Sequence, residues 1–466
     1  MFPTEAVSSA TLNDLLFYVV VMGLILVLAT FIRVRSKLLK KYFIPASLLA
    51  GFIGLILGPY GIKVLPEQML STWGALAGIL ISVVFAPMLI GLKRDSNQGG
   101  RTKLVARHLM FSYTGSLLQL SIPLIFASLI LIPFFGVNEM FASIIEVGWA
   151  GGHGTAAGMI EVYEGLNWSD GASLGVTSAT IGIVFGIISG IIMINHGAKK
   201  GYLSQIKSSD SIVLDDSSDI IPKEEQKPNA VNTINPDMVE SFAFHIGIIS
   251  IAILIGWFMQ KLIVQFVPGV PLFPLAMIGG FLINLVLSRT KYMDMIDVNT
   301  MNRIQGTALD FLIVGAVASI KVPIVIEFAV PLLLISALTA IMMIWYFYYL
   351  GRRFFPEDWF EHAIVHYGAY TGVTAIGLML LRVADPQMKT DASLGFALRA
   401  PFYSPFLGGG LITALIPVLM LNSSSLIVGL ACLSILIVLL VICKVTGLMV
   451  KPATQTIGGT DDRNVG

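Results

Sequence analysis

Charge and cysteine are both scarce in this sequence. Of its 466 residues only 12% are charged and 56% are apolar, whereas soluble domains carry about 25% charged residues. The two cysteines, Cys432 and Cys443, lie in one apolar run. On a helix that rises about 1.5 Å per residue they would stand roughly 16 Å apart, too far for a disulfide. The net charge of +1 gives no indication of nucleic-acid binding.

The signatures of an enzyme are missing as well. No Ser/His/Asp arrangement, phosphate-binding loop or nucleotide motif is found, so we expect no covalent chemistry, no cofactor and no transition metal. The chain instead holds apolar runs of about 20 residues, the length of a helix that crosses a bilayer. The predicted spans are 14–32, 43–62, 73–92, 107–133, 172–194, 241–262, 272–288, 306–324, 326–350, 395–420 and 424–448. These runs predict an all-α polytopic membrane protein rather than a soluble enzyme.

Basic residues predict the orientation of the chain. No Lys or Arg precedes the first span, and a basic cluster at 33–41 follows it. The positive-inside rule therefore places the N-terminus outside. The later basic clusters alternate consistently only if residues 136–165 enter and leave on the outer side and residues 358–390 on the inner side. Neither segment then spans the membrane, and we expect both to be re-entrant hairpins.

One long polar segment divides the chain. Residues 196–238 are rich in Ser, Asp, Pro and Lys, a composition that predicts a flexible cytoplasmic linker. It separates an N-terminal unit at 1–195 from a C-terminal unit at 239–421. The remaining residues, 422–466, add one transmembrane helix and a tail, which puts the C-terminus in the cytoplasm.

The two units repeat one another. "IPASLLAGFIGLILG" at 44–58 resembles "FPLAMIGGFLINLVL" at 273–287, "GTAAGM" at 154–159 resembles "VTAIGL" at 373–378, and "DGASLG" at 170–175 resembles "TDASLG". Five spans per unit is an odd number, so the second unit is inserted upside down. We therefore expect two inverted-topology repeats of five transmembrane helices plus one re-entrant hairpin each, with one extra C-terminal helix. This organisation is typical of secondary transporters; a channel or a lipid-handling protein is the alternative.

The stretch "VGWAGGHGTAAGMIE" at 147–161 is too short and too rich in glycine to cross a bilayer. Non-helical backbone is tolerated at membrane depth only where protein covers it or where it lines a watery cavity. Its glycines allow a tight turn that brings backbone groups near a ligand. Helix N-termini at such breaks favour carboxylates, and free carbonyls can hold sodium. Two hairpins from opposite sides would meet near the midplane and enclose a small anion.

These hairpins resemble those of a known family. "GGHGTAAG" (151–158), "SATIGIVFGIISG" (178–190) and "VHYGAYTGVTAIGL" (365–378) are similar to the two hairpins and the glycine-spaced helix of the bacterial sodium/glutamate symporter family. The resemblance implies a homodimer in the bacterial inner membrane that carries glutamate or a related acidic amino acid with sodium. It also implies a scaffold domain and a mobile domain with both hairpins. The alternatives are sodium- or proton-coupled transport of another organic anion, and a channel-like or regulatory protein that does not transport.

Three features depart from the family pattern. Thr374 is followed by Ala375 where the family usually has a proline, Arg399 stands where we expect an apolar residue, and the run 424–448 lies beyond the family's usual end. Arg399 in an apolar span suits a substrate carboxylate, or it snorkels to the inner interface. Asp310 is either a coupling-ion ligand or an interfacial acid near the start of its helix.

The hairpins and the helices beside them supply the candidate site. We expect substrate contacts from Gly151, Gly152, His153, Gly154, Thr155, Gly372, Thr374 and Arg399. We expect ion contacts from Ala156, Thr180, Ala375 and Pro401, the last because proline frees nearby carbonyls. We expect Gly158, His366, Gly368 and Gly377 to support the hairpins. The two threonines have an alternative role, a bond to the preceding helical turn, and the stripe Gly182, Gly186 and Gly190 predicts close helix packing.

Overall fold

The computed structural model describes residues 6–41, 44–91, 102–204, 221, 223–226, 230–265, 270–386 and 388–450. All regular structure in these ranges is helical, which confirms the predicted all-helical class. The middle of the predicted linker and the tail beyond residue 450 lie outside the described residues.

The helices of the first half begin where the sequence supplies a start signal. The Ser8 side chain accepts a hydrogen bond from the backbone N–H of Thr11 at the start of α1. Pro45 and Pro66, whose φ is fixed and which lack an N–H, precede α3 and α4. The elements are α1 (Ser9–Arg35), α2 (Lys37–Lys41), α3 (Ala46–Leu57), α4 (Glu67–Phe85), η1 (Ala86–Leu89), α5 (Thr102–Phe126), η3 (Ala127–Leu131), α6 (Ile132–Phe135), α7 (Ser143–Ile145), η4 (Glu146–Ala150), α8 (Gly152–Gly158), α9 (Ile160–Gly165) and α10 (Gly171–Lys199).

The second half uses the same kinds of signal. Asp297 accepts hydrogen bonds from two backbone N–H groups at the start of α13, and Pro271 precedes α12. The elements are η6 (Lys223–Glu225), α11 (Ser241–Ile263), α12 (Leu272–Leu287), η7 (Lys291–Met295), α13 (Val298–Ala318), α14 (Val322–Glu327), α15 (Ala329–Trp345), η8 (Tyr346–Leu350), α16 (Gly351–Phe354), α17 (Trp359–Ala384), α18 (Ala392–Tyr403), α19 (Leu411–Leu419) and α20 (Ser425–Val445).

Eight helices among the described residues are long and apolar enough to cross a membrane. They are α1, α4 with η1, α5 with η3 and α6, α10, α11, α15 with η8 and α16, α17, and α20. By contrast, α3 and α12 have 12 and 16 residues. Their lengths of about 18 and 24 Å fall short of a hydrocarbon core of about 30 Å. The chain is a polytopic membrane protein in which the predicted spans 43–62 and 272–288 form shorter helices.

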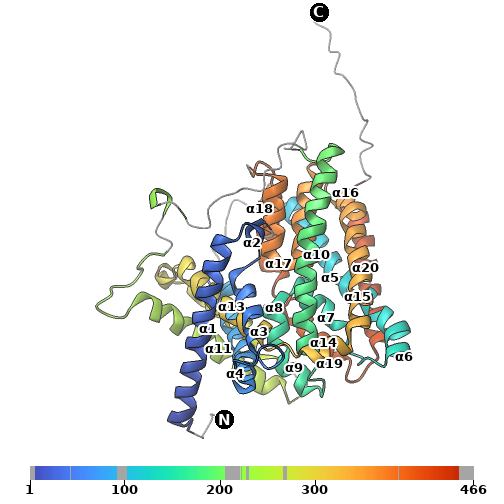
Figure 1. The fold of residues 1–466 in the computed structure, drawn as a ribbon. Helices are drawn as coiled ribbons and strands as arrows, with labels where there is room; N and C mark the ends of the chain where they lie inside the picture. The colour runs from blue at the N-terminus through green and yellow to red at the C-terminus, as the bar shows by residue number, and fades with distance from the viewer. Residues whose placement is uncertain are drawn as a thin grey trace, which may run out of the picture.

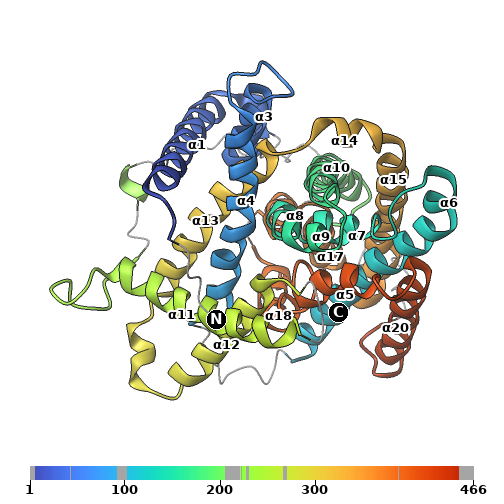
Figure 2. The same ribbon diagram turned by 90° about the horizontal axis from the view of Figure 1, so that it is seen from below.

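The helices form two groups that lie side by side (Figure 2). One group contains α1, α3, α4, α11, α12 and α13. The other contains α5, α8, α10, α15, α17, α18 and α20. Contacts of α8 with α4 and α13 join the two groups. Each group takes helices from both halves of the sequence, so the two groups do not correspond to the two halves.

The second predicted hairpin is formed by α17, which turns back in its middle. Gly372 (φ −159°, ψ 39°) and Val373 (φ 62°, ψ 172°) have non-helical backbone. A Cβ added at Gly368 would lie 2.6 Å from the Cα of Gly377, although nine residues of straight helix would separate these positions by about 13 Å. The two arms of α17 therefore pack side by side. The length and composition of α17 match those of a membrane-spanning helix, but α17 is a hairpin and not one continuous helix.

The first predicted hairpin reverses between η4 and α8. The hydroxyls of Ser143 in the first arm and Tyr163 in the second lie 2.9 Å apart, whereas 20 residues of continuous helix would span about 30 Å. The turn is at Gly151 and Gly152, and Gly152 has a φ of +75°, which glycine adopts without strain. One arm thus consists of α7 and η4 and the other of α8 and α9.

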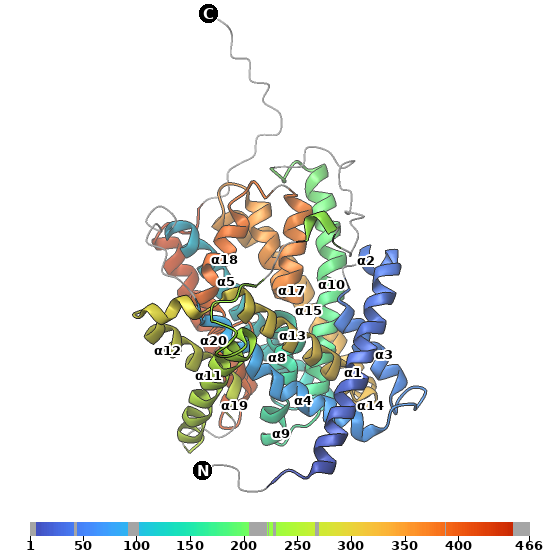
Figure 3. The same ribbon diagram turned by 90° about the vertical axis from the view of Figure 1, so that its left-hand side faces the viewer.

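The two hairpins approach from opposite ends of the molecule. In Figures 1 and 3, α9 lies toward the lower end and α17 toward the upper end, with α8 between them. Figure 1 also shows α14 and α19 at the lower end and α16 and α18 at the upper end. This arrangement fits the expectation that 136–165 and 358–390 enter from opposite sides.

The glycines of α10 face both hairpins. A Cβ added at Gly175 would lie 3.4 Å from the Cβ of Ala156 in the first hairpin. A Cβ added at Gly182 would lie 3.0 Å from the ring of Trp149 and 2.5 Å from the carbonyl oxygen of Thr371. The close packing predicted for this stripe is confirmed, and its partners are the hairpins themselves.

The order of elements recurs along the chain. The π-helical turns η3 and η8 begin at residues 127 and 346, which is 219 positions apart, and each is followed at once by a four-residue helix, α6 or α16, and then by a hairpin. Thr155 and Thr374 have the same separation, as do Gly158 and Gly377. Structure and sequence therefore repeat in the same register over this part of each half.

The predicted span at 395–420, in which Pro401 and Pro405 favour a break in the helix, is interrupted in the structure. α18 ends at Tyr403 and α19 begins at Leu411, so seven residues separate two shorter helices. Pro401 lies within α18 without ending it. The break holds Gly408 and Gly409, whose φ angles of +68° and +100° suit glycine and turn the chain sharply.

We predict that Gly377→Ala lowers the melting temperature of the detergent-solubilised protein. The new Cβ would collide with the carbonyl oxygen of Val365, and overpacking of this kind costs about 1–3 kcal/mol. Gly247→Ala is the matched control, because nothing lies within 4 Å of a Cβ at Gly247 and alanine favours the helix. Equal melting temperatures for the two variants would contradict the side-by-side packing of the α17 arms.

Candidate functional site

A cavity of about 580 Å³ lies between the two groups of helices. One wall comes from α3, α4 and α13 and includes Ser47, Ile81 and Asp310. The opposite wall comes from both hairpin tips, α10 and α18. The cavity therefore lies where the two hairpins meet, between the two groups of helices that are in contact through α8.

The two hairpin tips touch each other. A Cβ added at Gly152 would collide with the Cγ1 of Val373, so the first tip has room only for glycine. Val373 has a φ of 62° and a ψ of 172°, a region that residues other than glycine rarely adopt. Such a conformation costs about 1–3 kcal/mol and persists where the surroundings enforce it. The contact between the tips is one such constraint.

Arg399 places an unpaired cation on the cavity wall. Only 3% of the residue is exposed, and the rings of Phe396 and Tyr403 lie 4.0 and 4.5 Å from its guanidinium carbon. Its Nε has no hydrogen-bond partner, and within the described part of the chain no acidic side chain pairs with it. A buried cation without a partner is costly, so the cavity favours an anion. Such burial argues against snorkelling to the interface.

The cavity gathers most of the residues predicted to contact substrate. Gly151, His153, Gly154, Thr155, Gly372, Thr374 and Arg399 line it, together with Ala375. The Nε2 of His153 lies 3.0 Å from the hydroxyl of Thr180. The Thr155 hydroxyl donates to the carbonyl of Gly151, so it satisfies its own helix, whereas Thr374 is exposed.

Four predicted contact residues do not line the cavity. Gly152 is covered by the second tip, and Ala156 is fully buried. The hydroxyl of Thr180 donates within α10, and Pro401 is half-buried within α18. Of the predicted ion ligands, only Ala375 reaches the cavity wall.

The predicted supporting residues lie away from the cavity wall. A Cβ added at Gly158 would lie 2.8 Å from Ile81 of α4, and Gly368 faces Gly377 within the second hairpin. His366 is fully buried, and its Nε2 lies 2.8 Å from the Nδ1 of His108.

A buried carboxylate in the first hairpin was not singled out from the sequence. Glu146 is fully buried in η4. Its Oε1 accepts hydrogen bonds from the backbone N–H of Gly408 at 2.8 Å and from the Ser116 hydroxyl at 3.2 Å, while Oε2 has no partner. The Ser116 hydroxyl also lies 2.5 Å from that of Tyr403, whose ring packs on Arg399. An acid immediately before the glycine-rich turn, in a chain so poor in charge, was the signal that could have revealed it.

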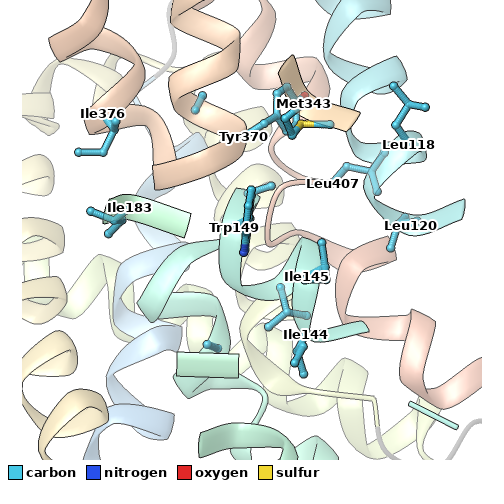
Figure 4. Close-up of a cluster of buried hydrophobic side chains, with 14 of the residues drawn as sticks. Leu118, Leu120, Ile144, Ile145, Trp149, Ile183, Met343, Tyr370, Ile376 and Leu407 are labelled. Carbon is cyan, nitrogen blue, oxygen red and sulfur yellow. The ribbon is translucent and has the colours of Figure 1, made fainter. Parts of the chain in front are cut away.

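Buried apolar side chains hold the first hairpin tip in place (Figure 4). Trp149 is fully buried. Figure 4 shows it with Ile183 on one side, Ile144 and Ile145 on the other, and Tyr370 of the second hairpin above it. Protein thus covers the glycine turn, as the bilayer requires of non-helical backbone.

The fold and the cavity together define a class, a polytopic helical membrane protein whose two broken hairpins meet at an internal anion-favouring cavity. A family model for the sodium/glutamate symporter matches residues 12–380. The chain belongs to the sodium/glutamate symporter family, which is a family of transporters and not of enzymes. The match includes both hairpin tips and ends before Arg399 and α20. A comparison with curated proteins gave no match.

We predict that Gly152→Ala reduces sodium-dependent glutamate uptake into proteoliposomes by roughly tenfold, because a collision worth about 1–3 kcal/mol would hold the hairpin tips apart. Gly136→Ala is the matched control. Gly136 also has a positive φ, +62°, but nothing lies within 4 Å of its added Cβ. The Gly136→Ala variant therefore tests the effect of backbone strain without a collision. Normal uptake by Gly152→Ala would contradict a functional role for the tip contact.

Proposed function

We propose that the protein uses a sodium gradient to take up glutamate or a related acidic amino acid by alternating access of the central cavity. The family indicates sodium as the coupling ion and glutamate as the substrate class. The observation that carries the proposal is the unpaired Arg399 on the cavity wall. A solute that enters this cavity neutralises the cation only if it brings a negative charge.

Arg399 would bind a carboxylate of the substrate. A guanidinium offers a planar fork of N–H donors that matches a carboxylate in two parallel hydrogen bonds. Phe396 and Tyr403 pack against it and would hold its orientation. Because the side chain is almost fully buried, little solvent would screen the attraction.

Asp310 would bind the amino group of the substrate. It lies on α13 in the other group of helices and lines the same cavity, where it is exposed. An acidic amino acid carries one ammonium group and two carboxylates near neutral pH. A carboxylate and a guanidinium on facing walls would give each kind of charge a partner and would favour an amino acid over a simple dicarboxylate.

Sodium would bind where broken backbone lies near a buried carboxylate. The Oε2 of Glu146 is buried without a hydrogen bond of good geometry, although the Thr413 hydroxyl interacts with the carboxyl group, and a cation beside Oε2 would supply the missing charge. Ala375 follows the second tip and lines the cavity. Ala156, Thr180 and Pro401 do not line this cavity, so any ion contact from them would lie outside it.

Alternating access would come from movement of the hairpins past α4 and α13. Gly154 and Gly158 pack against Ile81 of α4, and glycine faces of this kind let helices approach closely and shift. A second cavity of about 480 Å³ has Glu161 and Lys321 in its lining. α8 lines the first cavity and α9, which follows it in the same arm of the hairpin, lines the second, so a displacement of this arm would change both.

The recurring π-turn, four-residue helix and hairpin support an arrangement of two inverted repeats. Alternating access needs two nearly equivalent states, and pseudo-symmetric repeats supply them. With the basic cluster at 33–41 inside, the N-terminus would face outward and the C-terminus the cytoplasm. We further propose a homodimer in the bacterial inner membrane, as the family resemblance implies, with the hairpin-bearing group of helices as the mobile part.

We predict that proteoliposomes with an inward sodium gradient accumulate radiolabelled glutamate above its external concentration, and that a matched potassium gradient gives none. Accumulation requires coupling, because a channel only equalises concentrations. Accumulation of a different anion would change the proposed substrate, and accumulation driven by a proton gradient would change the proposed coupling ion. Either result would leave the assignment as a transporter unchanged. No accumulation of any tested anion would favour a non-transporting membrane protein.

We also predict that Arg399→Gln weakens the binding of both glutamate and glutarate, the dicarboxylate that lacks the amino group. The loss should be roughly 10- to 150-fold, since a hydrogen bond to a charged group contributes about 1.5–3 kcal/mol. Asp310→Asn should weaken glutamate alone, by roughly tenfold, or about 1.4 kcal/mol. Arg382→Gln, at an exposed position, is the control. Equal losses of both ligands in Asp310→Asn would contradict its role at the amino group.

A further inference from the structure

Three buried histidines form a continuous chain beside the cavity. The Nε2 of His108 on α5 lies 2.9 Å from the Nδ1 of His362, and its Nδ1 lies 2.8 Å from the Nε2 of His366. The Nδ1 of His366 in turn lies 3.3 Å from the Ser112 hydroxyl. His108, His366 and Ser112 are fully buried, and His362 is 6% exposed. Half of the six histidines in the sequence therefore lie in one hydrogen-bonded row.

The row can hold its protons in two complete orders. Each neutral imidazole has one N–H donor and one acceptor nitrogen, and a hydroxyl can do either. The bonds can therefore all run from His362 toward Ser112 or all run the other way. An extra proton that enters at one end can be passed from ring to ring, because each bond offers an acceptor nitrogen to the next donor.

The surroundings of the row are aromatic. The ring of Phe355 stacks on His362 with centroids 4.8 Å apart, and the ring of Phe111 lies 5.0 Å from His366. Among the described residues no group of His, Cys, Asp and Glu is arranged to hold a metal ion, and both nitrogens of His108 already face other imidazoles. The proton is therefore the ligand that this chemistry fits.

One end of the row lies next to Arg399. The ring of Phe396 separates the two, with its centroid 5.1 Å from that of His366 and 4.0 Å from the guanidinium carbon of Arg399. Tyr370, which lines the cavity, donates its hydroxyl to the carbonyl of Ser112. The row thus reaches the layer of side chains that forms the cavity wall.

The charges that face the row differ at its two ends. Arg399 of α18 faces His108 and His366. Asp358 and Asp391, which precede α17 and α18, face His362 together with Arg107 of α5. Positive charge opposes an added proton at the inner end, and the two carboxylates favour one at the outer end. Burial of the row is the largest obstacle to an added proton, and neutralising Arg399 would remove only the part that its positive charge adds.

We propose that the histidine row takes up a proton when an anionic substrate binds at Arg399, so that substrate binding and proton binding are linked. The inference rests on the proposed function, because the anion that neutralises Arg399 is the substrate. It adds a proton-binding site that is linked to the substrate site. Charge explains the linkage, since the substrate carboxylate cancels the repulsion between Arg399 and a protonated row.

The proton would enter from water at His362, the only partly exposed member of the row. Its Nε2 would accept the proton and its Nδ1–H would pass to the Nε2 of His108. The Nδ1–H of His108 would then pass to the Nε2 of His366. The row keeps one extra proton and one positive charge while the anion is bound. It returns the proton to water along the same path when the anion leaves.

The test is calorimetric titration of the purified full-length protein with glutamate in sodium-containing solution. Two buffers at the same pH that differ in ionisation enthalpy separate the heat of binding from the heat of proton uptake. We expect the wild-type protein to take up a net fraction of a proton, at most about one per substrate because the three rings share it. Because binding takes up protons, affinity should rise as the pH falls.

Two variants interrupt the row at different places. His108→Phe removes its centre, and His362→Gln removes the end that meets water; His196→Gln, at an exposed site on α10, is the control. We expect both variants in the row to bind glutamate without proton uptake and the control to behave as wild type. His362→Gln keeps the test valid if His108→Phe fails to fold.

Proton uptake by the row variants equal to that of the wild type would overturn the inference. So would wild-type binding without any proton uptake, although that result leaves the proposed sodium-coupled function intact. A protein that gives no binding heat with glutamate, glutarate or aspartate would overturn the proposed function and this inference with it.

Discussion

Turns of the backbone within a bilayer are stable only where protein covers them, and this constraint organises the molecule. The two hairpins expose non-helical backbone at Gly151–Gly152 and at Gly372–Val373, and lipid offers these groups no hydrogen-bond partner. The glycine face of α10 packs on both hairpins, and the tips cover each other. The strained Val373 is held in the same place. The packing that covers the two turns therefore also forms the site.

The chemistry of the cavity follows from charges that have no partner inside the protein. Arg399 lies on the wall with its Nε unpartnered, and Glu146 in the first hairpin has one oxygen without a donor. Glu146 accepts hydrogen bonds, but no oppositely charged side chain among the described residues pairs with it or with Arg399, and burial makes each charge costly. An anion and a cation that bind together would satisfy both, which is the reason that a symporter accounts for this arrangement better than a channel.

The two groups of helices and the two halves of the sequence divide the molecule differently. The two halves resemble each other, because the π-turns, the short helices and the hairpins recur at a spacing of 219 residues. The groups form because α1, α3 and α4 pack with α11, α12 and α13, while both hairpins pack on α10. Nothing in hydropathy reports which helices from distant parts of the chain become neighbours.

The sequence alone determined the helical membrane class, the hairpins and the family, because the length of apolar runs, the sign of flanking charges and the GGHG turn are local properties. It also marked Arg399, and most of the residues predicted to contact substrate line the cavity. Only the tertiary structure decided that Ala156, Thr180 and Pro401 lie off the cavity wall, because that depends on how the helices pack around the cavity. The prolines of the predicted span 395–420 favour the break between α18 and α19, but its sharp turn depends on the conformations of Gly408 and Gly409, which hydropathy does not report. The row of His108, His362 and His366 joins residues about 250 positions apart, and only packing brings such distant side chains into hydrogen-bond contact.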